Sequence, residues 1–268
     1  MTDGAGRTPL TFTAMTYNLW GRWRVADRMP ALRGMLRLRQ PDLLATQELH
    51  PVSRDTVDAA LPGHDRVHDD FPGWATRSNL WWRRDLFSTN GHGAEDVGIR
   101  SEHARLFWVR LRRPGAPELV FATAHLTWPG HPDEIADDRS PRVAQSRAIV
   151  AALADLAGPD DAVLFCSDVN DYARPLWTFQ DAGYAEPFGW LGTVSPVTHP
   201  VYPLALAQPP RQPGVQITQK AIDWQFLRGP LRPRSAEVVE YFADGVAPSD
   251  HKPVLCTYGF PAEREDER

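Results

Sequence analysis

The chain has 268 residues, of which 42% are hydrophobic and 24% are charged, and its formal net charge is −5. These values are typical of a globular protein with one or two domains. Proteins that bind nucleic acid without sequence preference are usually basic, because phosphate neutralisation supplies most of their affinity. The acidic balance therefore argues against a dedicated nucleic-acid-binding module.

The start of the chain, "MTDGAGRTPL", has no basic segment followed by an apolar one, and no run approaches about 18 apolar residues. We therefore expect a cytoplasmic protein with no stable membrane insertion. Cys166 and Cys256 both lie in apolar, strand-like runs. In the cytoplasm such cysteines are usually buried thiols, so no disulfide is expected.

Strands and helices are predicted in irregular alternation along the chain. Short apolar or alternating runs predict strands at residues 10–18, 42–48, 78–84, 104–112, 118–126, 162–168, 221–227, 236–242 and 252–260. Apolar positions on one side and residues typical of helix ends predict helices at residues 30–39, 53–63, 140–158 and 175–183. Ser53 and Ser140 are the expected helix caps.

The strands outnumber the helices, and the sequence has no internal repeat. This order favours an α+β fold, with sheets packed as a sandwich and helices outside, over a strictly alternating parallel fold. We expect a single domain over residues 1–260, with a proline-rich irregular loop at residues 189–214. The charged residues 261–268 are expected to form a disordered tail.

Polar groups stand where several of the predicted strands begin or end. In "AVLFCSDVND" an apolar strand stops at Asp168, and Asn170 follows. Asp223 lies inside an otherwise apolar strand, where a carboxylate is costly to bury unless it is paired or bound to a metal. Each such group alone fits a turn or a solvent-facing strand end, but their recurrence predicts one shared site. The others are Asn18, Glu48, His125, Asp250 and His251.

The sequence has no Cys/His tetrad and no HExxH motif, which argues against a zinc site. The carboxylates and amides instead favour a metal ion that prefers oxygen ligands. Mg²⁺ is typically held by one or two carboxylates with water and substrate phosphate, and Mn²⁺ is the alternative ion. Histidines beside such a metal suit proton transfer at phosphorus. The residues therefore predict metal-assisted hydrolysis of a phosphoester.

Six motifs, "TYNLW", "TQE", "AHLTW", "SDVND", "AIDWQF" and "SDHKPV", follow one another between about Met15 and Val254. In this order they resemble the endonuclease/exonuclease/phosphatase superfamily, which has a deoxyribonuclease-I-like fold. The resemblance implies a four-layer α/β-sandwich, in which two packed, mainly antiparallel β-sheets are flanked by helices. It also implies metal binding by Asn18, Glu48 and Asp250.

The same resemblance implies catalytic roles for the other polar residues. Asp168 matches the aspartate that orients or deprotonates the attacking water, and Asn170 matches an asparagine that contacts the phosphate. His251 matches the histidine of proton transfer, with Asp223 as its orienting partner. His125 matches a histidine that stabilises the phosphate or assists the leaving group.

These motifs leave the substrate open. Histidine at position 125, in place of tyrosine, resembles phosphatase-, sphingomyelinase- or deoxyribonuclease-I-like members more than those that repair abasic DNA. The acidic segment "HPDEIADDR" that follows would repel a long polyanion at the mouth of the site, although a solvated loop is an equal interpretation. The segment "GRWRVADR" after Asn18 can grip phosphates and stack bases, or it can serve packing alone.

We therefore expect a divalent-metal-dependent phosphoester hydrolase, a phosphodiesterase or phosphatase, with a small or lipid-like substrate. The alternative among enzymes is a Mg²⁺-dependent endo- or exonuclease, whose partner would be DNA or RNA. The second alternative is a non-catalytic member that binds a partner through the same scaffold. Retention of a polar group at every matched position argues against this last interpretation.

Overall fold

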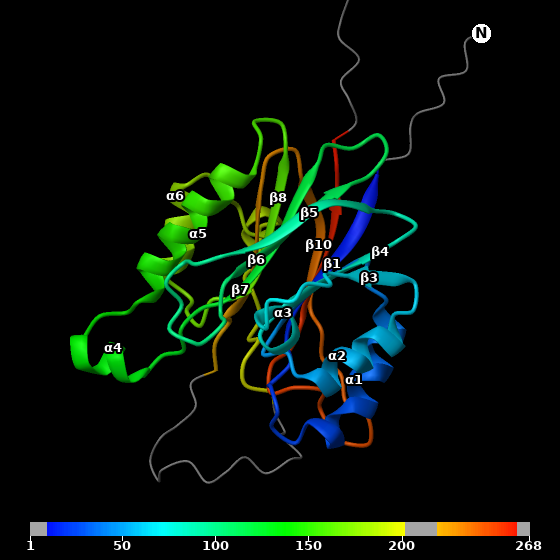
Figure 1. Cartoon of the computed structure of the whole chain (residues 1–268), viewed down its shortest axis with the longest axis vertical. Coiled ribbons are helices and arrows are strands. Elements are labelled where there is room, and N and C mark those ends of the chain that lie inside the picture. Colours follow the sequence, from blue (N-terminus) through cyan, green and yellow to red (C-terminus); the bar gives the residue numbers. More distant parts are fainter. Residues whose placement is uncertain (1–9, 202–218, 262–268) are drawn as a thin grey trace, which may run out of the picture.

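The computed structural model describes residues 10–201 and 219–261, which form two β-sheets packed face to face between helices (Figure 1). The expected four-layer α/β-sandwich is confirmed. Residues 202–214 of the predicted loop lie outside the described residues, and so does the predicted tail apart from Pro261. The prediction of a single domain stays a prediction.

The first sheet has the strand order β10-β11-β1-β2-β4-β3. Its strands are β1 (Thr11–Asn18), β2 (Leu43–Gln47), β3 (His64–Arg66), β4 (Asn79–Arg83), β10 (Arg232–Val238) and β11 (Val254–Gly259). β1 and β2 run parallel, and the other neighbours run antiparallel. β1 therefore lies between β2, which follows it in the chain, and β11, the last strand.

The second sheet has the strand order β5-β6-β7-β8-β9. Its strands are β5 (Ser88–Glu95), β6 (Leu106–Arg112), β7 (Leu119–His125), β8 (Ala162–Asp168) and β9 (Asp223–Arg228). β7 and β8 run parallel, and the other neighbours run antiparallel. Both sheets are thus mixed and mainly antiparallel.

Helices cover the outer face of each sheet, on opposite sides of the sandwich (Figure 1). α1 (Val25–Arg39) and α2 (Pro51–Ala60) pack on the first sheet through side chains such as Leu36 and Val57. α5 (Arg142–Leu156) and α6 (Arg174–Asp181) pack on the second sheet through Ile149 and Phe179. The described residues also include the short helices α3 (Gly73–Thr76), α4 (Pro132–Asp137) and α7 (Pro187–Trp190). In the described part of the chain, no helix has the length and apolar character needed to cross a membrane.

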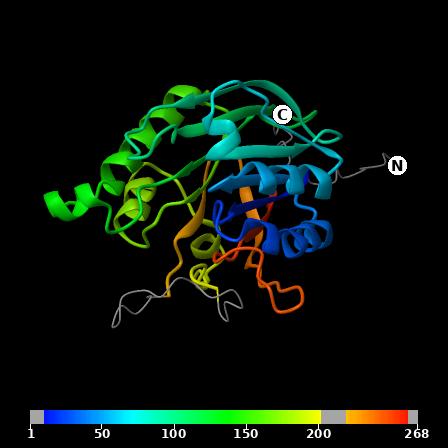
Figure 2. The same ribbon diagram turned by 60° about the horizontal axis from the view of Figure 1, so that its bottom comes forward.

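The inner faces of the two sheets change from apolar to polar near one end. Successive side chains of a strand point to opposite faces, so Cys166 of β8 points into the core between the sheets and Asp168 follows on the same face. The ends of β1, β7 and β9 repeat the pattern with Asn18, His125 and Asp223. The register pairs His125 with Asp168, and Asp168 with Asp223. Alternation and register together bring these side chains to one end of the seam, the end that comes forward in Figure 2.

Two buried glutamines connect the sheets close to this end. Nε2 of Gln47 in β2 donates to Oγ1 of Thr123 in β7 at 2.9 Å. Nε2 of Gln225 in β9 donates to the carbonyl oxygens of Ala14 (3.1 Å) and Val254 (2.9 Å) in the first sheet. A buried amide that loses its partners costs about 1–3 kcal/mol. These bonds therefore favour one relative position of the two sheets.

The helix starts differ from those that the sequence predicts. α1 begins at Val25, ahead of the predicted start at Pro30, which lies inside the helix. His50, and not Ser53, is the N-cap of α2, and Oγ of Ser53 accepts from the backbone N–H of His50 at 3.1 Å. Ser53 is thus the third helical residue of a capping box. Ser140 lies one residue before the N-cap of α5, so it does not cap that helix either.

Three strands also differ from the prediction. β3 was not predicted, because it has only three residues and none of them is apolar. β5 is a strand that the sequence analysis missed, because most of its residues are exposed and polar and it lacks an apolar alternation. The strand predicted at residues 236–242 is β10, which starts at Arg232 and includes Pro233. β10 is an edge strand with a bulge after Pro233, and both features tolerate a residue without a backbone N–H. Cys166 and Cys256 are buried free thiols, as predicted.

Candidate active site

Asp168 lies at the centre of the site, and 1% of its surface is exposed. Its Oδ2 accepts from Nδ2 of Asn18 at 2.9 Å. The same oxygen lies 3.4 Å from Nε2 of His125 and 3.9 Å from Nε2 of His251. Its Oδ1 accepts from the backbone N–H of Asn170 at 2.8 Å. One buried carboxylate is thus surrounded by an amide, a backbone donor and two imidazoles.

These surroundings raise the pKa of the Asp168 carboxyl above its usual value. Burial is the main cause, since it penalises the charged form, and the charge of Asp223 acts in the same direction. The charges of His125 and His251 and the hydrogen bond from Asn18 act in the opposite direction. A carboxylate with a raised pKa takes up a proton closer to neutral pH, which is what a general base requires.

Asp223 and His251 form a buried pair, in which Oδ2 of Asp223 lies 2.9 Å from Nδ1 of His251. This contact turns Nε2 of the ring towards Asp168. Oγ1 of Thr198 accepts from the backbone N–H of Asp223 at 3.2 Å and so holds the end of β9. Burial alone would lower the pKa of His251, but the charge and hydrogen bond of Asp223 and the charges of Asp168 and Asp250 raise it well above its usual value.

Asn18 connects Asp168 with Glu48, because its Nδ2 also donates to Oε1 of Glu48 at 3.1 Å. Oδ1 of Asn18 accepts from the backbone N–H of Trp20 at 2.9 Å, which sets the orientation of the amide. Glu48 follows β2 with a φ of 50°, in the left-handed region, and this conformation turns its side chain to the site. A Cβ on Gly21 would lie 3.3 Å from Oε2 of Glu48, so the glycine leaves room for the carboxylate.

Asn170 and His125 meet on the other side of Asp168. Nδ2 of Asn170 lies 2.9 Å from Nε2 of His125 and donates to the carbonyl oxygen of Leu126 at 2.9 Å. An amide nitrogen only donates, so Nε2 of His125 accepts in this contact and a neutral ring carries its proton on Nδ1. Asn170 has a φ of 53°, which bends the chain sharply after β8.

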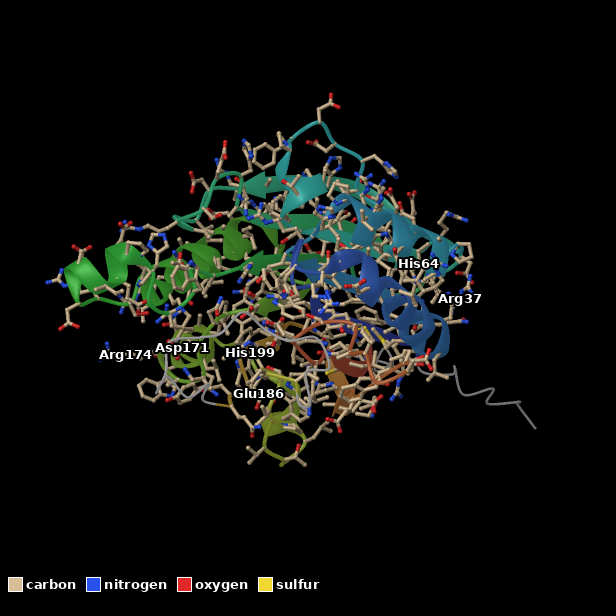
Figure 3. The ribbon with its side chains drawn as sticks, turned by 90° about the horizontal axis from the view of Figure 1, so that it is seen from below. Arg37, His64, Asp171, Arg174, Glu186 and His199 are labelled. Carbon is tan, nitrogen blue, oxygen red and sulfur yellow. The ribbon has the colours of Figure 1, made fainter. Side chains whose placement is uncertain are left out.

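His199 belongs to the site although the sequence analysis did not identify it. Its Nε2 lies 3.7 Å from Oδ2 of Asp250, and its ring packs against that of His251 with centroids 4.5 Å apart. Figure 3 shows His199 near the middle of the face seen from below. Ligand atoms of His199, Asp250 and His251 lie within 4.8 Å of one another, as do those of Asp168, Asp223 and His251, so each group could hold a metal ion. His199 lies in the proline-rich segment, where no sequence motif marked it.

Arg28 supports the loop that follows Asn18. Its side chain is buried, and its guanidinium nitrogens donate to five backbone carbonyl groups. These belong to Leu19, Trp20, Gly21, Trp23 and Pro248. Arg24 of the same segment pairs with Asp27. Both arginines are therefore engaged within the fold, which favours the packing interpretation of "GRWRVADR".

Arginines also neutralise part of the acidic segment after His125. Arg142, at the start of α5, donates to both carboxylate oxygens of Glu134. Arg100 pairs with Asp133. α4, which carries both acidic residues, projects from the body of the molecule (Figure 1). The segment therefore repels a polyanion less than its sequence suggests.

All of the polar residues predicted for the site lie at this end of the sandwich. Asn18, Glu48, His125, Asp168 and Asn170 form one connected set of hydrogen bonds and close contacts. Asp223 and His251 join it through Asp168, and Asp250 joins through His251, whose Nε2 is 3.9 Å from its Oδ1. Their individual roles stay predictions.

Two mixed sheets of this kind, flanked by helices and closed at one end by Asp, Asn and His side chains, define a deoxyribonuclease-I-like sandwich with a phosphoesterase type of site. The chain belongs to the endonuclease/exonuclease/phosphatase family, whose sequence profile matches residues 15–251. The resemblance inferred from the six motifs is thereby confirmed. No curated protein sequence matches the chain.

Solved structures share the fold at low sequence identity. TDP2 of D. rerio, complexed with a single-strand DNA product, is 19% identical with a TM-score of 0.75, covering 92% of this chain and 98% of that chain. An endonuclease/exonuclease/phosphatase of Bacteroides vulgatus is 15% identical with a TM-score of 0.74, covering 94% and 100%. A mannosyl-6-phosphatase of Bacteroides thetaiotaomicron is 17% identical with a TM-score of 0.70, covering 93% and 100%. At these identities the likeness establishes the fold alone.

Proposed function

We propose that this protein is a divalent-metal-dependent hydrolase of phosphoesters, a phosphodiesterase or phosphatase with a small or lipid-like substrate. The observation that carries the proposal is the buried Asp168 carboxylate, held between the Asn18 amide and the imidazoles of His125 and His251. Buried ionisable groups with perturbed pKa values and specific partners are typical of active sites. We also expect the protein to act in the cytoplasm, an expectation that its free buried thiols support.

Mg²⁺ is the proposed cofactor, with Mn²⁺ as the alternative. Glu48 and Asp250 offer the carboxylate oxygens that such ions prefer. Nδ2 of Asn18 donates to Oε1 of Glu48, and among the described residues no hydrogen-bond donor contacts Oε2. Oδ1 of Asn18 is bound to a backbone N–H, so this amide fits the role of a donor that orients Glu48 better than that of an oxygen ligand. The bound metal would polarise the phosphoryl oxygens and stabilise the charge that develops on them.

In the proposed reaction Asp168 accepts a proton from the attacking water, and the oxygen of that water forms a bond to phosphorus. The bond between phosphorus and the leaving oxygen breaks with its electron pair on that oxygen. His251, kept protonated by Asp223, gives a proton to the leaving oxygen. Asn170 and His125, which meet beside Asp168, contact the phosphate oxygens. Exchange with solvent then removes the proton from Asp168 and restores that of His251, so the net change is the addition of one water.

A nuclease acting on DNA or RNA is the second candidate, and two observations favour it. The similar TDP2 structure holds a DNA product, and arginines pair with Asp133 and Glu134 near the site. The similar mannosyl-6-phosphatase supports a small substrate instead. A non-catalytic role is less well supported, because the chain has a polar residue at every matched position and these residues lie together at one end of the sandwich.

The proposal is tested with bis(p-nitrophenyl) phosphate, a sugar 6-phosphate and supercoiled plasmid, each incubated with Mg²⁺ and with EDTA. We expect hydrolysis of at least one small ester with Mg²⁺ alone, and no nicking of the plasmid. Asp168→Ala serves as the inactive enzyme, and Asp160→Asn, at an exposed position in a turn, serves as the matched control. Nicking by the wild type and not by Asp168→Ala would replace the proposal by the nuclease. Failure to hydrolyse any of the three would favour the non-catalytic alternative.

A further inference from the structure

A cavity of about 300 Å³ opens beside Glu48 and His125. Its walls come from residues 77–78, from residues 99–107 around the start of β6, and from residues 125–131 after β7. Ligand cavities usually measure about 300–1,000 Å³. This one has room for a single ring-sized unit beside the proposed site, and not for a nucleic-acid duplex or a two-chain lipid.

The floor of the cavity is apolar and its edge is aromatic. Ile99, Ala104, Phe107 and Leu126 are buried side chains that line it. Trp128 also lines it and is 53% exposed, which is unusual for so large an apolar side chain. An exposed indole beside an apolar floor offers a stacking surface for a flat ring.

The rim of the cavity is cationic, with Arg77, Arg100 and Arg105. Arg100 pairs with Asp133, and an NH group of Arg105 lies 3.8 Å from a carboxylate oxygen of Asp96. Within the described parts of the chain, no carboxylate lies at ion-pair distance from Arg77. Its Nε donates to a backbone carbonyl at 2.8 Å, which anchors the side chain and leaves its charge without a counterpart. One anionic group of a ligand would therefore give Arg77 the ion-pair partner that the other two arginines already have.

We propose that this cavity binds a flat ring of the substrate together with a second anionic group, next to the phosphorus that is attacked. The inference rests on the proposed phosphoesterase function. A terminally phosphorylated nucleotide has this chemistry: its base stacks on Trp128, its terminal phosphate pairs with Arg77, and the neighbouring phosphodiester lies beside Glu48 and His125. The site then selects short substrates with a terminal phosphate over internal bonds of a polymer.

The test compares the dinucleotide TpT with its 5′-phosphorylated form pTpT and its 3′-phosphorylated form TpTp. All three contain the same internal diester, so a difference in kcat/KM reports recognition of the extra phosphate. Hydrogen bonds to charged groups are strong enough for a preference of roughly tenfold or more. We expect wild-type enzyme to show this preference for one of the two phosphorylated forms, and the preferred form identifies the strand end that occupies the cavity.

Two pairs of variants complete the test. Arg77→Gln should remove the preference, and Trp128→Ala should lower kcat/KM for all three dinucleotides. The matched controls are Arg37→Gln and Trp177→Ala, at exposed positions on other elements, and they should change neither value. Figure 3 shows Arg37 well to the side of the site.

The possible failures are distinguishable. Equal hydrolysis of TpT, pTpT and TpTp by the wild type, or a preference that survives Arg77→Gln, would overturn the inference and leave the phosphoesterase intact. Absence of hydrolysis of every ester, the nitrophenyl ester included, would overturn the proposed function and the inference with it. Circular dichroism must match the wild type for any variant that loses activity.

Discussion

The Asp223 carboxylate lies 2.9 Å from Nδ1 of His251, although β9 carries one residue and the segment before β11 carries the other. Both side chains are buried, with 1% and 6% of their surfaces exposed. The pair leaves Nε2 of His251 as the nitrogen that faces Asp168. Orientation and protonation of this imidazole thus depend on one neighbouring carboxylate.

Exchange of Asp223 for asparagine should therefore change the pH dependence of turnover. The Asp223 charge helps to raise the pKa of His251, so its removal lowers that pKa and moves the alkaline limb of the kcat profile to lower pH. We expect His251→Ala to lower kcat by roughly 10²–10⁴-fold, and Asp223→Asn to lower it by less. Steady-state kinetics over pH on a hydrolysed ester measures both effects. An unshifted profile with wild-type kcat in Asp223→Asn would show that the pair is not used.

Asp168→Asn should stabilise the metal-free protein. The raised pKa of the Asp168 carboxyl means that folding disfavours its ionised form. The charge therefore costs stability at pH values above the pKa of this group in the unfolded protein. We therefore expect the Tm of Asp168→Asn in EDTA at pH 7.5 to lie above that of the wild type. The difference should shrink as the pH falls through the raised pKa, because protonation then removes the same charge from the wild type. A variant less stable than the wild type at neutral pH would contradict this expectation.

Arg28 should be required for stability. Its replacement by lysine leaves one ammonium group for the five carbonyl oxygens that the guanidinium satisfies. The ammonium group has three N–H donors, so at least two carbonyl groups lose their partner. Since each unsatisfied buried group costs about 1–3 kcal/mol, we expect Arg28→Lys to lower the free energy of unfolding by at least about 2 kcal/mol. Arg37→Lys, at an exposed position of the same helix, should stay within about 0.5 kcal/mol of the wild type. Urea denaturation followed by tryptophan fluorescence measures both, and equal values would refute the role given to Arg28.

Glu48→Gln should weaken metal binding without harming the fold. A ligand that binds only the folded state raises its stability in proportion to ln(1 + [L]/Kd). Mg²⁺ should therefore raise Tm of the wild type in a concentration-dependent way, and the same increase should need at least tenfold more Mg²⁺ in Glu48→Gln. Glu240→Gln, which removes a carboxylate paired with Lys252, is the control and should respond like the wild type. Isothermal titration calorimetry gives the two Kd values directly, and equal values would exclude Glu48 from the metal site.

Much of the site could be predicted from the sequence because local rules determine it. Alternation along β8 places Asp168 on the same face as the buried Cys166, and the same rule applies to Asn18, His125 and Asp223. The strand-end motifs therefore predict both which residues form the site and to which face of the sheet their side chains point. That the four ends meet was inferred only from their recurrence and from the family resemblance, because it depends on strand register and on the packing of the two sheets.

The residues that the prediction missed depend on contacts across the fold. His199 reaches the site because its backbone pairs with Lys220, and a proline-rich sequence gives no sign of that pairing. Arg28 was considered only as a residue that grips phosphate or packs, since its carbonyl partners come from a loop and from Pro248, far along the chain. β5 was missed for a different reason, because an exposed strand without apolar alternation has no strong local signal.

The central claim is that Asp168 activates water for attack on phosphorus, and the most direct test is the kcat of Asp168→Asn on bis(p-nitrophenyl) phosphate in Mg²⁺. The asparagine keeps an oxygen that can accept from Asn18 but cannot take up the proton of water. We predict a loss of at least roughly 10²-fold in kcat, with unchanged circular dichroism and with Mg²⁺ still bound. Turnover close to that of the wild type in a folded, Mg²⁺-bound Asp168→Asn protein would contradict the account.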